Sequence, residues 1–251
     1  MSEATGRRVA RRELTFDELT AEGWAGAPGV LARLQLELPV GAAVRCSAPA
    51  EQTAGVPPLP ELMVGGGFVV ESARQARGQS LVDARRDRTL PDFVGPGMRI
   101  LVCGLNPSLV AADAGFGYAG VTNRFWSVAV AAGIVTHPRQ PLVSLVEDGV
   151  GMTDLVKRAT PNADSLTPAE YQAGAVRVAR LVEWLRPGVV LSVGLAGWRA
   201  AIDRRAQPGP QPSPFGGVPA YVMPSTSGRN ARTSPAELAA HMRQALALAP
   251  P

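Results

Sequence analysis

Two polar loops, far apart in the sequence, carry the side chains that could do chemistry. The first contains Asn106 within the run Gly104 to Ser108, directly after an apolar stretch that is typical of a buried strand. The second comes after another apolar stretch and consists of Ser225, Thr226, Ser227, Gly228 and Arg229. Because ligands of open α/β sheets bind where strands end at the carboxyl edge, one site built from both loops is predicted. An uncharged amide together with small hydroxyls and an arginine favours a reaction at a sugar within nucleic acid over acid–base chemistry on a free metabolite.

From Met98 onward, apolar stretches alternate with helical patterns, as in a parallel α/β sheet. Three stretches are expected to be its strands: 99–104, 188–193 and 220–223. The first two are continuous apolar runs, which indicates burial on both faces of the sheet. Capping boxes with a proline at the first helical position predict helices that begin after Thr167 and Ser234. A further helix is expected from Asn123 to about residue 132.

Residues 1–87 differ from the rest of the chain and are predicted to form an accessory region of uncertain fold. Its expected elements are a short helix over 15–22 and a strand over 34–44 that Pro39 interrupts. Three further segments follow: a proline-rich connector (49–60), a flexible glycine turn (65–67) and an arginine-rich stretch that forms a solvated face (74–88). Our hypothesis is that this region, with its arginines and basic start, adds non-specific affinity for DNA without contributing catalytic groups. The alternative is a structural cover whose apolar residues 68–70 pack on the remaining chain.

The chain has 251 residues, 46% hydrophobic and 18% charged, which describes one large globular domain or a compact domain with a smaller one. No apolar run is long enough for a membrane span, and the polar N-terminus lacks the apolar core of an export signal. A cytoplasmic protein without a membrane partner is therefore expected. The net charge is +4, and Lys157 is the only lysine among the cations. Excess arginine permits a nucleic-acid partner, but a compositional bias would produce the same charge.

Metal and nucleotide-cofactor chemistry are both disfavoured by the sequence. Cys46 and Cys103 cannot build a cysteine-ligated metal site alone, and two reduced thiols are expected. His137 and His241 stand far apart, without acidic or cysteine neighbours at ligand spacing. The run 115–120 matches the Gly-x-Gly-x-x-Gly letters of a dinucleotide site, but no strand leads directly into it and no helix begins within it. Neither a metal nor an organic cofactor is expected.

Several blocks of sequence become recognisable when they are taken together. They are Arg88 to Gly97, Gly104 to Pro107, Gly115 to Tyr118, Asn123 to Trp126, Gly151 to Val156 and Met223 to Arg229. In this order and spacing they resemble the mismatch-specific uracil-DNA glycosylase/thymine-DNA glycosylase family of the uracil-DNA glycosylase superfamily. The resemblance covers about residues 88–248.

The resemblance implies a three-layer α/β/α sandwich with a mainly parallel central sheet for residues 88–251. It also implies hydrolysis of the N-glycosidic bond of uracil, and in some members of thymine or modified cytosine, in G·U or G·T mispairs of double-stranded DNA. Such an enzyme flips the target nucleotide out of the duplex. It needs no metal or cofactor, and this chain is expected to act as a monomer in base-excision repair.

The family's pattern assigns roles to residues of the first loop and its surroundings. Asn106 matches the asparagine that positions the attacking water, since its amide oxygen can hold a water but cannot store a proton; the alternative is a turn asparagine before a proline. Tyr118 matches the aromatic residue that stacks on the flipped base, and the alternative is local packing. Backbone amides around Leu105 and Tyr118 are candidate donors to the pyrimidine. Asn123 matches a position near the base pocket and fits a helix cap equally well.

The second loop is expected to contact DNA. Arg229 falls on the wedge position, which fills the space left by the flipped base; the alternative is a surface arginine that contacts phosphate only. The hydroxyl residues of this loop are expected to bind phosphates beside the lesion: Ser225, Thr226 and Ser227, followed by Gly228.

Three residues depart from the family's pattern. Ser108 replaces a common glycine and either tightens its loop or adds a hydroxyl near the water. Asp154 stands where relatives have lysine or asparagine, so the loss of a charged contact to DNA is expected. Met223 replaces the asparagine of uracil-specific relatives and resembles the thymine-processing branch. The preferred lesion stays open, and so does a second class of function, a DNA-damage-binding protein on the same fold with little turnover.

Overall fold

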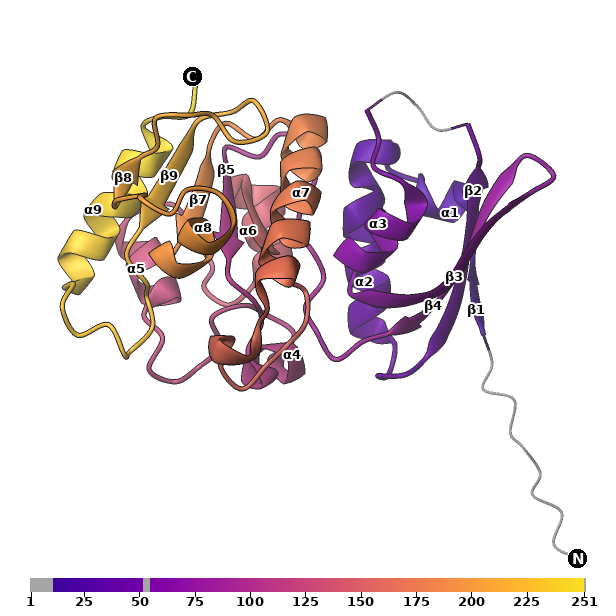
Figure 1. The fold of residues 1–251 in the computed structure, drawn as a ribbon, viewed down its shortest axis with the longest axis horizontal. Helices are drawn as coiled ribbons and strands as arrows, with labels where there is room; N and C mark the ends of the chain where they lie inside the picture. Colours follow the sequence, from indigo (N-terminus) through magenta and orange to yellow (C-terminus); the bar gives the residue numbers. More distant parts are fainter. Residues whose placement is uncertain (1–10, 52–54, 251) are drawn as a thin grey trace, which may run out of the picture.

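The computed structural model describes residues 11–51 and 55–250, which form two parts that lie side by side (Figure 1). The larger part contains a five-stranded sheet in the order β6-β5-β7-β9-β8. Its strands are β5 (Ile100–Gly104), β6 (Val150–Asp154), β7 (Val190–Val193), β8 (Gly209–Pro210) and β9 (Ala220–Met223). Strands β6, β5, β7 and β9 are parallel, and the short edge strand β8 runs antiparallel to β9. The predicted, mainly parallel α/β sheet is therefore confirmed.

Helices cover both faces of this sheet. They are α4 (Leu109–Ala114), α5 (Phe125–Ala131), α6 (Pro141–Asp148), α7 (Pro168–Leu185), α8 (Leu195–Ala201) and α9 (Pro235–Leu246), with a 3-10 turn at Ala163–Ser165. Because alternate residues of a strand point to opposite faces, Ile100 and Val102 of β5 pack in one core with α5 and α9. Leu101 and Cys103 pack in another core with α7. The result is the expected three-layer α/β/α sandwich.

Local sequence signals set most of the helix ends in the larger part. Thr167 and Ser234 form the predicted capping boxes at the starts of α7 and α9. The helix expected from Asn123 begins slightly later, because Arg124 occupies the capping position of α5 and the helix starts at Phe125. The Asn123 side chain nevertheless accepts a hydrogen bond from the Phe125 backbone N–H at 3.0 Å. Asn123 therefore still supports the start of the helix.

The described part of the N-terminal region is a folded unit with its own core. Its sheet has the order β1-β2-β4-β3, with strands β1 (Arg12–Leu14), β2 (Ala43–Pro49), β3 (Phe68–Ala76) and β4 (Gln79–Arg86). Its helices are α1 (Phe16–Leu19), α2 (Ala27–Glu37) and α3 (Leu59–Gly65), with a 3-10 turn at Trp24–Gly26. The helices lie between this sheet and the larger part (Figure 1). Leu31 and Met63 of these helices are buried in one core with Val82 of the sheet.

One predicted element of this region is wrong. The strand expected over 34–44 does not exist, because residues up to Glu37 belong to α2 and the next strand, β2, begins at Ala43. The helix expected over 15–22 is present with the shorter bounds of α1. The connector predicted over 49–60 runs into α3, whose first residue is Leu59. The glycine turn lies where α3 ends, and Gly67 adopts the left-handed backbone there (φ 85°). Residues 6–10 of the basic start lie outside the described residues.

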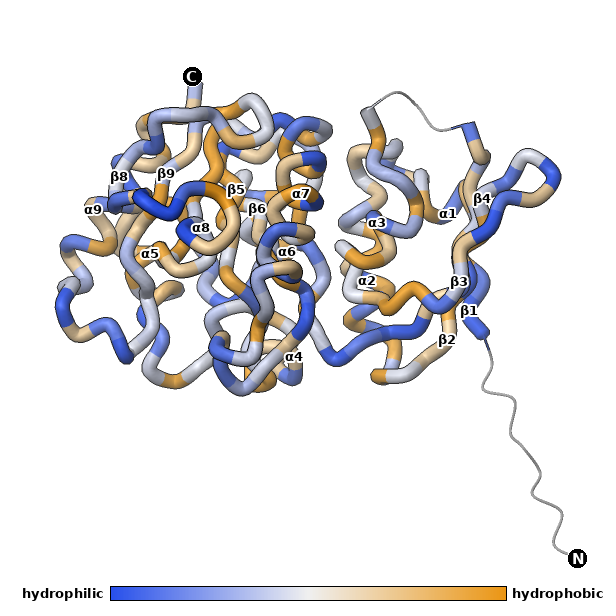
Figure 2. Tube along the Cα trace, in the orientation of Figure 1, coloured by the Kyte–Doolittle hydropathy of each residue, from blue (hydrophilic) through white to orange (hydrophobic). Residues whose placement is uncertain are grey.

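Hydropathy follows this architecture. Figure 2 shows apolar residues on the interior strand β5 and hydrophilic residues at the tip of the hairpin that joins β3 and β4. That hairpin contains most of the arginine-rich stretch 74–88. The expected solvated face is confirmed for the exposed strand β3, but residues 82–84 of β4 are buried. Across residues 11–51 and 55–250, no helix combines the length and the apolar character needed to cross a membrane.

Close contacts join the two parts of the molecule. The Asp92 backbone N–H donates to the Gly65 carbonyl oxygen at 2.7 Å, and the buried Gln35 amide donates to the Thr89 carbonyl oxygen at 2.8 Å. A Cβ atom on Gly65 would lie 2.7 Å from a carboxylate oxygen of Asp92, so a side chain at this position would displace the buried Asp92 carboxylate. Trp184 of α7 packs against the N-terminal core as well as its own. The segment that leads into β5 is therefore held from the N-terminal side.

Candidate active site

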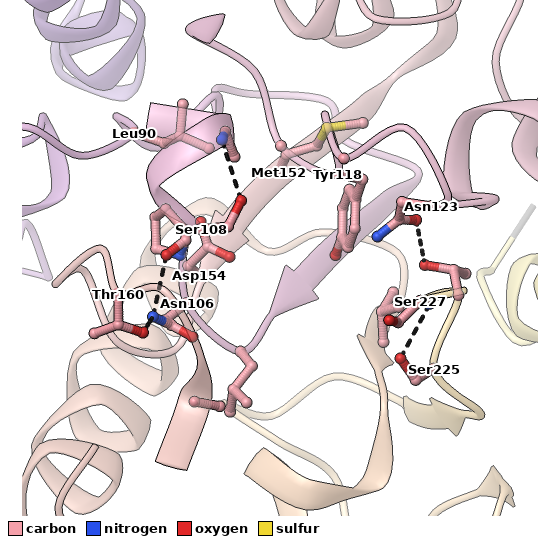
Figure 3. A pocket seen from close by; sticks show the side chains of 18 of the residues that line it. Leu90, Asn106, Ser108, Tyr118, Asn123, Met152, Asp154, Thr160, Ser225 and Ser227 are labelled. Carbon is pink, nitrogen blue, oxygen red and sulfur yellow. Dashed lines mark hydrogen bonds between the residues drawn. The ribbon is translucent and has the colours of Figure 1, made fainter. Parts of the chain in front are cut away.

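A cavity of about 350 Å³ opens at the carboxyl edge of the larger sheet (Figure 3). Its walls come from segments that follow β5, β6 and β9, and from residues 90–93. The loop that contains Asn106 and the loop 225–227 both line it. The two loops singled out from the sequence therefore meet in one cavity, whose size falls within the range of small-ligand pockets.

Asn106 is held with its amide nitrogen turned away from the cavity centre (Figure 3). The Nδ2 atom donates to Thr160 Oγ1 at 2.8 Å and to the Arg158 carbonyl oxygen at 3.0 Å, and it lies 3.1 Å from the Pro107 carbonyl oxygen. Thr160 donates its own hydroxyl proton to the Asn162 carbonyl oxygen at 2.6 Å, so its oxygen is free to accept from Asn106. These contacts occupy the donor end of the amide and leave Oδ1 as the acceptor available to a water.

Tyr118 forms an aromatic wall of the cavity. Its ring stacks on Phe125 with a centroid distance of 4.0 Å and an interplanar angle of 16°. The backbone of Tyr118 adopts the left-handed conformation (φ 59°), which is uncommon for an aromatic residue and brings the ring into the cavity wall. The ring therefore packs locally, and a flat base entering the cavity would extend the existing stack. Leu105 lines the same cavity.

The Tyr118 hydroxyl is buried and has no hydrogen-bond partner within the described residues. Burial raises the pKa of this phenol well above 10, and the negative charge of Asp154 raises it further. The phenol is therefore neutral at physiological pH.

Asp154 stands at the end of β6 and lines the cavity. A Cβ atom on Gly104, its partner in the neighbouring strand β5, would collide with the Asp154 carboxylate and lie 3.1 Å from the Tyr118 hydroxyl. Burial raises the pKa of Asp154 to about 6, and Asp92 also raises it, while Lys157 and Arg177 oppose that shift. The predicted loss of a charged contact to DNA at this position stays a prediction, and the structure places the Asp154 carboxyl group in the pocket wall.

A buried ion cluster lies behind this wall. Asp92 accepts hydrogen bonds from Thr153 Oγ1 at 2.7 Å and Lys157 Nζ at 2.9 Å, and it forms an ion pair with Arg177. Burial alone would raise the pKa of Asp92, but the charges of Arg177 and Lys157 hold it below its usual value. Arg177 also donates to the backbone carbonyl oxygen of Asp154 at 2.7 Å. The cluster therefore fixes the end of β6 and hence the place of Asp154.

The loop after β9 is built by short side-chain contacts. Thr226 is 1% exposed, and its hydroxyl donates to Asn123 Oδ1 at 2.9 Å. This contact corrects the expected role of Thr226, because the hydroxyl holds Asn123 and is not offered to a phosphate. Figure 3 shows the Asn123 amide nitrogen directed toward the cavity. Asn123 thus both supports the helix start and presents a donor to the site. Ser225 and Ser227 line the same edge of the cavity.

Arg229 is exposed beyond the rim of the cavity and does not line it. Its guanidinium forms no hydrogen bond or ion pair with the residues that the structure describes. Gly228 beside it approaches the loop 120–123 so closely that a Cβ atom would lie 2.6 Å from the Thr122 side chain. The geometry leaves Arg229 free to reach toward a bound duplex, and both the wedge and the phosphate roles stay open.

A family model described as the uracil DNA glycosylase superfamily matches residues 91–248. The chain belongs to the uracil DNA glycosylase superfamily. This membership indicates a DNA glycosylase, that is, a hydrolase that acts on N-glycosidic bonds and serves DNA repair. The matched residues contain all the loops that build the cavity except for Leu90.

The cavity is lined by further residues that no sequence motif indicated. Thr160 and Asn162 orient the Asn106 amide, although they belong to the loop after β6 and carry no motif of their own. The one available signal is that this polar loop follows a buried strand end. Ser108 caps α4 by accepting from the Ala111 backbone N–H at 3.1 Å, so it tightens the loop. Met223 is fully buried in the core and does not line the cavity.

Within the described residues, no group of three or more His, Cys, Asp and Glu side chains is arranged to hold a metal ion. Cys46 and Cys103 are free and buried, as expected for reduced thiols. Burial raises the pKa of both thiols to about 12, so neither is a nucleophile near neutral pH.

Proposed function

We propose that this chain is a monofunctional, mismatch-specific DNA glycosylase that acts as a monomer and releases uracil from G·U pairs of double-stranded DNA. Thymine in G·T pairs and modified cytosine are further candidate substrates. The observation that carries the proposal is the fixed orientation of the Asn106 amide. Because Thr160 and Arg158 occupy its donor end, Oδ1 is presented as a water acceptor inside a cavity that has an aromatic wall.

The chemistry follows from these groups. A flipped nucleotide would place its base in the cavity, stacked on Tyr118, at a cost of roughly a few kcal/mol for unstacking. The C1′–N1 bond then breaks, and its electron pair leaves with the base. The oxygen of the water held by Asn106 bonds to C1′. Asn106 cannot store a proton, so the proton of the water passes to solvent, and the released base takes up a proton in turn.

The groups that line the cavity suit a reaction in which the C1′–N1 bond breaks largely before the water attacks. Such a reaction needs a positioned water and hydrogen-bond donors for the departing base more than it needs a strong base. Asn123 presents an amide nitrogen at the cavity, and the serine-rich loop after β9 closes the same side. These groups match the requirement.

The proposal is tested by incubating excess enzyme with labelled duplexes that contain G·U, A·U, G·T or G·C at one position. Alkaline cleavage then reveals abasic sites. We expect product from G·U duplexes at a higher single-turnover rate than from A·U duplexes, and none from G·C. Equal rates on G·U and A·U would contradict mismatch specificity, and a lack of product from every uracil-containing duplex would contradict glycosylase activity.

A second candidate function is a DNA-damage-binding protein with little turnover. The favouring observation is that the water-facing group is an amide, which is a weak promoter of hydrolysis. The same assay decides between the two, because a binding protein would shift the G·U duplex in a gel without producing abasic sites.

A further inference from the structure

The Asp154 carboxyl group is an acid in the wall of the cavity that the mechanism above does not use. It accepts no hydrogen bond and forms no ion pair within the described residues. Its position is nevertheless well determined, because Arg177 holds its backbone and Gly104 leaves the space into which its carboxyl group fits. A carboxyl group in this setting lacks a structural partner on the protein.

The charged and titratable groups around Asp154 leave it without a counter-ion. Lys157 and Arg177 both direct their cationic groups to Asp92, the second carboxylate of this region. Cys103 and Tyr118 face it from β5 and from the loop 117–123, and burial keeps both in their neutral forms. Burial therefore raises the pKa of Asp154 to about 6, so the carboxyl group is neutral below that pH and charged above it.

A neutral carboxylic acid and a carboxylate offer different contacts to a base. The acid has one O–H donor beside one acceptor, whereas the carboxylate has acceptors only. Uracil presents an N–H donor beside carbonyl acceptors, and cytosine presents an amino donor beside a ring-nitrogen acceptor. The acid complements either edge, while the carboxylate would also repel the negative charge that develops on the departing base.

We propose that Asp154 is a catalytic residue that, as a neutral carboxylic acid, donates a hydrogen bond to the departing base. This inference rests on the proposed glycosylase function. The electron pair of the C1′–N1 bond leaves with the base, and the Asp154 proton is shared with a carbonyl oxygen or ring nitrogen of the base as charge builds there. If that proton is transferred, the proton released by the attacking water restores the acid through solvent, so the overall reaction remains a hydrolysis.

The proposal determines the sign of the pH dependence. The neutral form of Asp154 dominates below about pH 6 and is lost as the pH rises above it. The rate of base release should therefore be highest in mild acid and should fall by up to about tenfold per pH unit above the pKa.

The test measures single-turnover release of uracil from a G·U duplex between pH 5.5 and pH 8 with saturating enzyme. Asp154→Asn places a donor at this site at every pH, so its profile should be flat. At pH 8 the variant should be about tenfold or more faster than the unaltered chain, and at pH 5.5 the two rates should be similar. Asp17→Asn, which removes an exposed carboxylate on α1, is the matched control and should keep the original profile.

The outcomes separate this inference from the proposed function. A complete lack of uracil release by the unaltered chain at every pH contradicts the function itself. If the unaltered chain releases uracil, the role of Asp154 is overturned by an Asp154→Asn variant whose rate keeps the original dependence on pH. It is also overturned by a variant that is slower than the unaltered chain at pH 8. If Asp154→Asn does not fold, as judged by its thermal melt, the profile of the unaltered chain still decides. A rate that does not change between pH 5.5 and pH 8 overturns the inference.

Discussion

The Asn106 amide has two chemically different ends, and its neighbours determine which end faces the cavity. Thr160 is the key neighbour, because its hydroxyl donates to a backbone carbonyl and must therefore accept from Asn106. A threonine without any motif thus controls the direction of the group that is proposed to hold the water.

Thr160→Val removes this acceptor and keeps the shape of the side chain. We expect base release to slow by about fivefold to tenfold, the effect of losing a hydrogen bond worth about 1–1.5 kcal/mol. Single-turnover rates on a G·U duplex measure the effect, and Thr160→Ser should restore the rate. An unchanged rate in the valine variant would show that Thr160 does not orient the amide.

Arg229 offers a second prediction at this scale. If its exposed side chain fills the space left by the flipped base, Arg229→Ala should slow reaction on duplex DNA by about tenfold or more and leave single-stranded uracil substrates nearly unaffected, because only the duplex must be opened. Parallel assays on both substrates, with Arg232→Ala as an exposed-arginine control, provide the comparison. An equal loss on both substrates would indicate a phosphate contact instead.

At the scale of secondary structure, the site depends on where neighbouring strands end. Parallel pairing places Gly104 of β5 beside Asp154 of β6, and the ring of Tyr118 reaches the same place from a separate loop. Because Gly104 has no side chain, it leaves the space that the Asp154 carboxylate and the Tyr118 hydroxyl occupy. The register of two strands therefore positions the acid in the cavity wall.

Gly104→Ala should consequently disturb both stability and activity. The added methyl group collides with the Asp154 carboxylate, and overpacking of this kind costs about 1–3 kcal/mol of unfolding free energy. Chemical unfolding and uracil release measure the two effects. Gly95→Ala is the control, because its Cβ would meet no atom closer than 3.7 Å. Equal stability of the two variants would show that the packing at the end of β5 is looser than described.

The motif-bearing parts of this site could be predicted from sequence because the residues within each loop are close together and form a local motif. Strand ends placed Asn106 and the loop 225–229 in one site, and the family resemblance added Tyr118 to it. Thr160 and the setting of Asp154 could not be predicted, since they depend on contacts across β5 and β6 and the loops that follow them. A local pattern conveys a loop's chemistry but not the partner that orients it.

Helix and strand patterns can also coincide, as in the N-terminal region. Leu34, Leu36 and Leu38 alternate with polar residues, which predicted a strand. The observed helix α2 instead buries Leu31 and Leu34, while Leu36 is 39% exposed. The deciding contact is the packing of α2 on the N-terminal sheet, which a short window of sequence does not contain.

At the scale of the whole molecule, the N-terminal part acts as a support for the larger part. Gly65 and Gln35 hold the segment 89–92, which leads toward the cavity and contributes Asp92 to the buried ion cluster. The structural-cover alternative is wrong in its detail, because Phe68 and Val70 pack in the N-terminal core and not on the larger part. The contacts made by Gly65 and Gln35 nevertheless favour a supporting role over a detachable accessory region for DNA affinity.

A chain truncated to begin at Arg88 should therefore aggregate or lose its cooperative thermal melt. Loss of the N-terminal part would expose the apolar side chains of α7, including Trp184, and leave Asp92 without its backbone partner Gly65. A chain that lacks only residues 2–10 is the control, because it keeps every contact described above. A truncated chain that melts cooperatively and releases uracil at the original rate would restore the accessory-region hypothesis.

The presentation of a water by Asn106 is tested most directly by single-turnover release of uracil from a G·U duplex by Asn106→Ala. We expect the rate to fall by about 100-fold or more, as for the loss of one positioned electrostatic group, while the variant keeps a cooperative thermal melt and its affinity for abasic DNA. Gln75→Ala, which removes an exposed amide on β3, should keep the original rate. A near-original rate in a folded Asn106→Ala variant would remove Asn106 from the reaction.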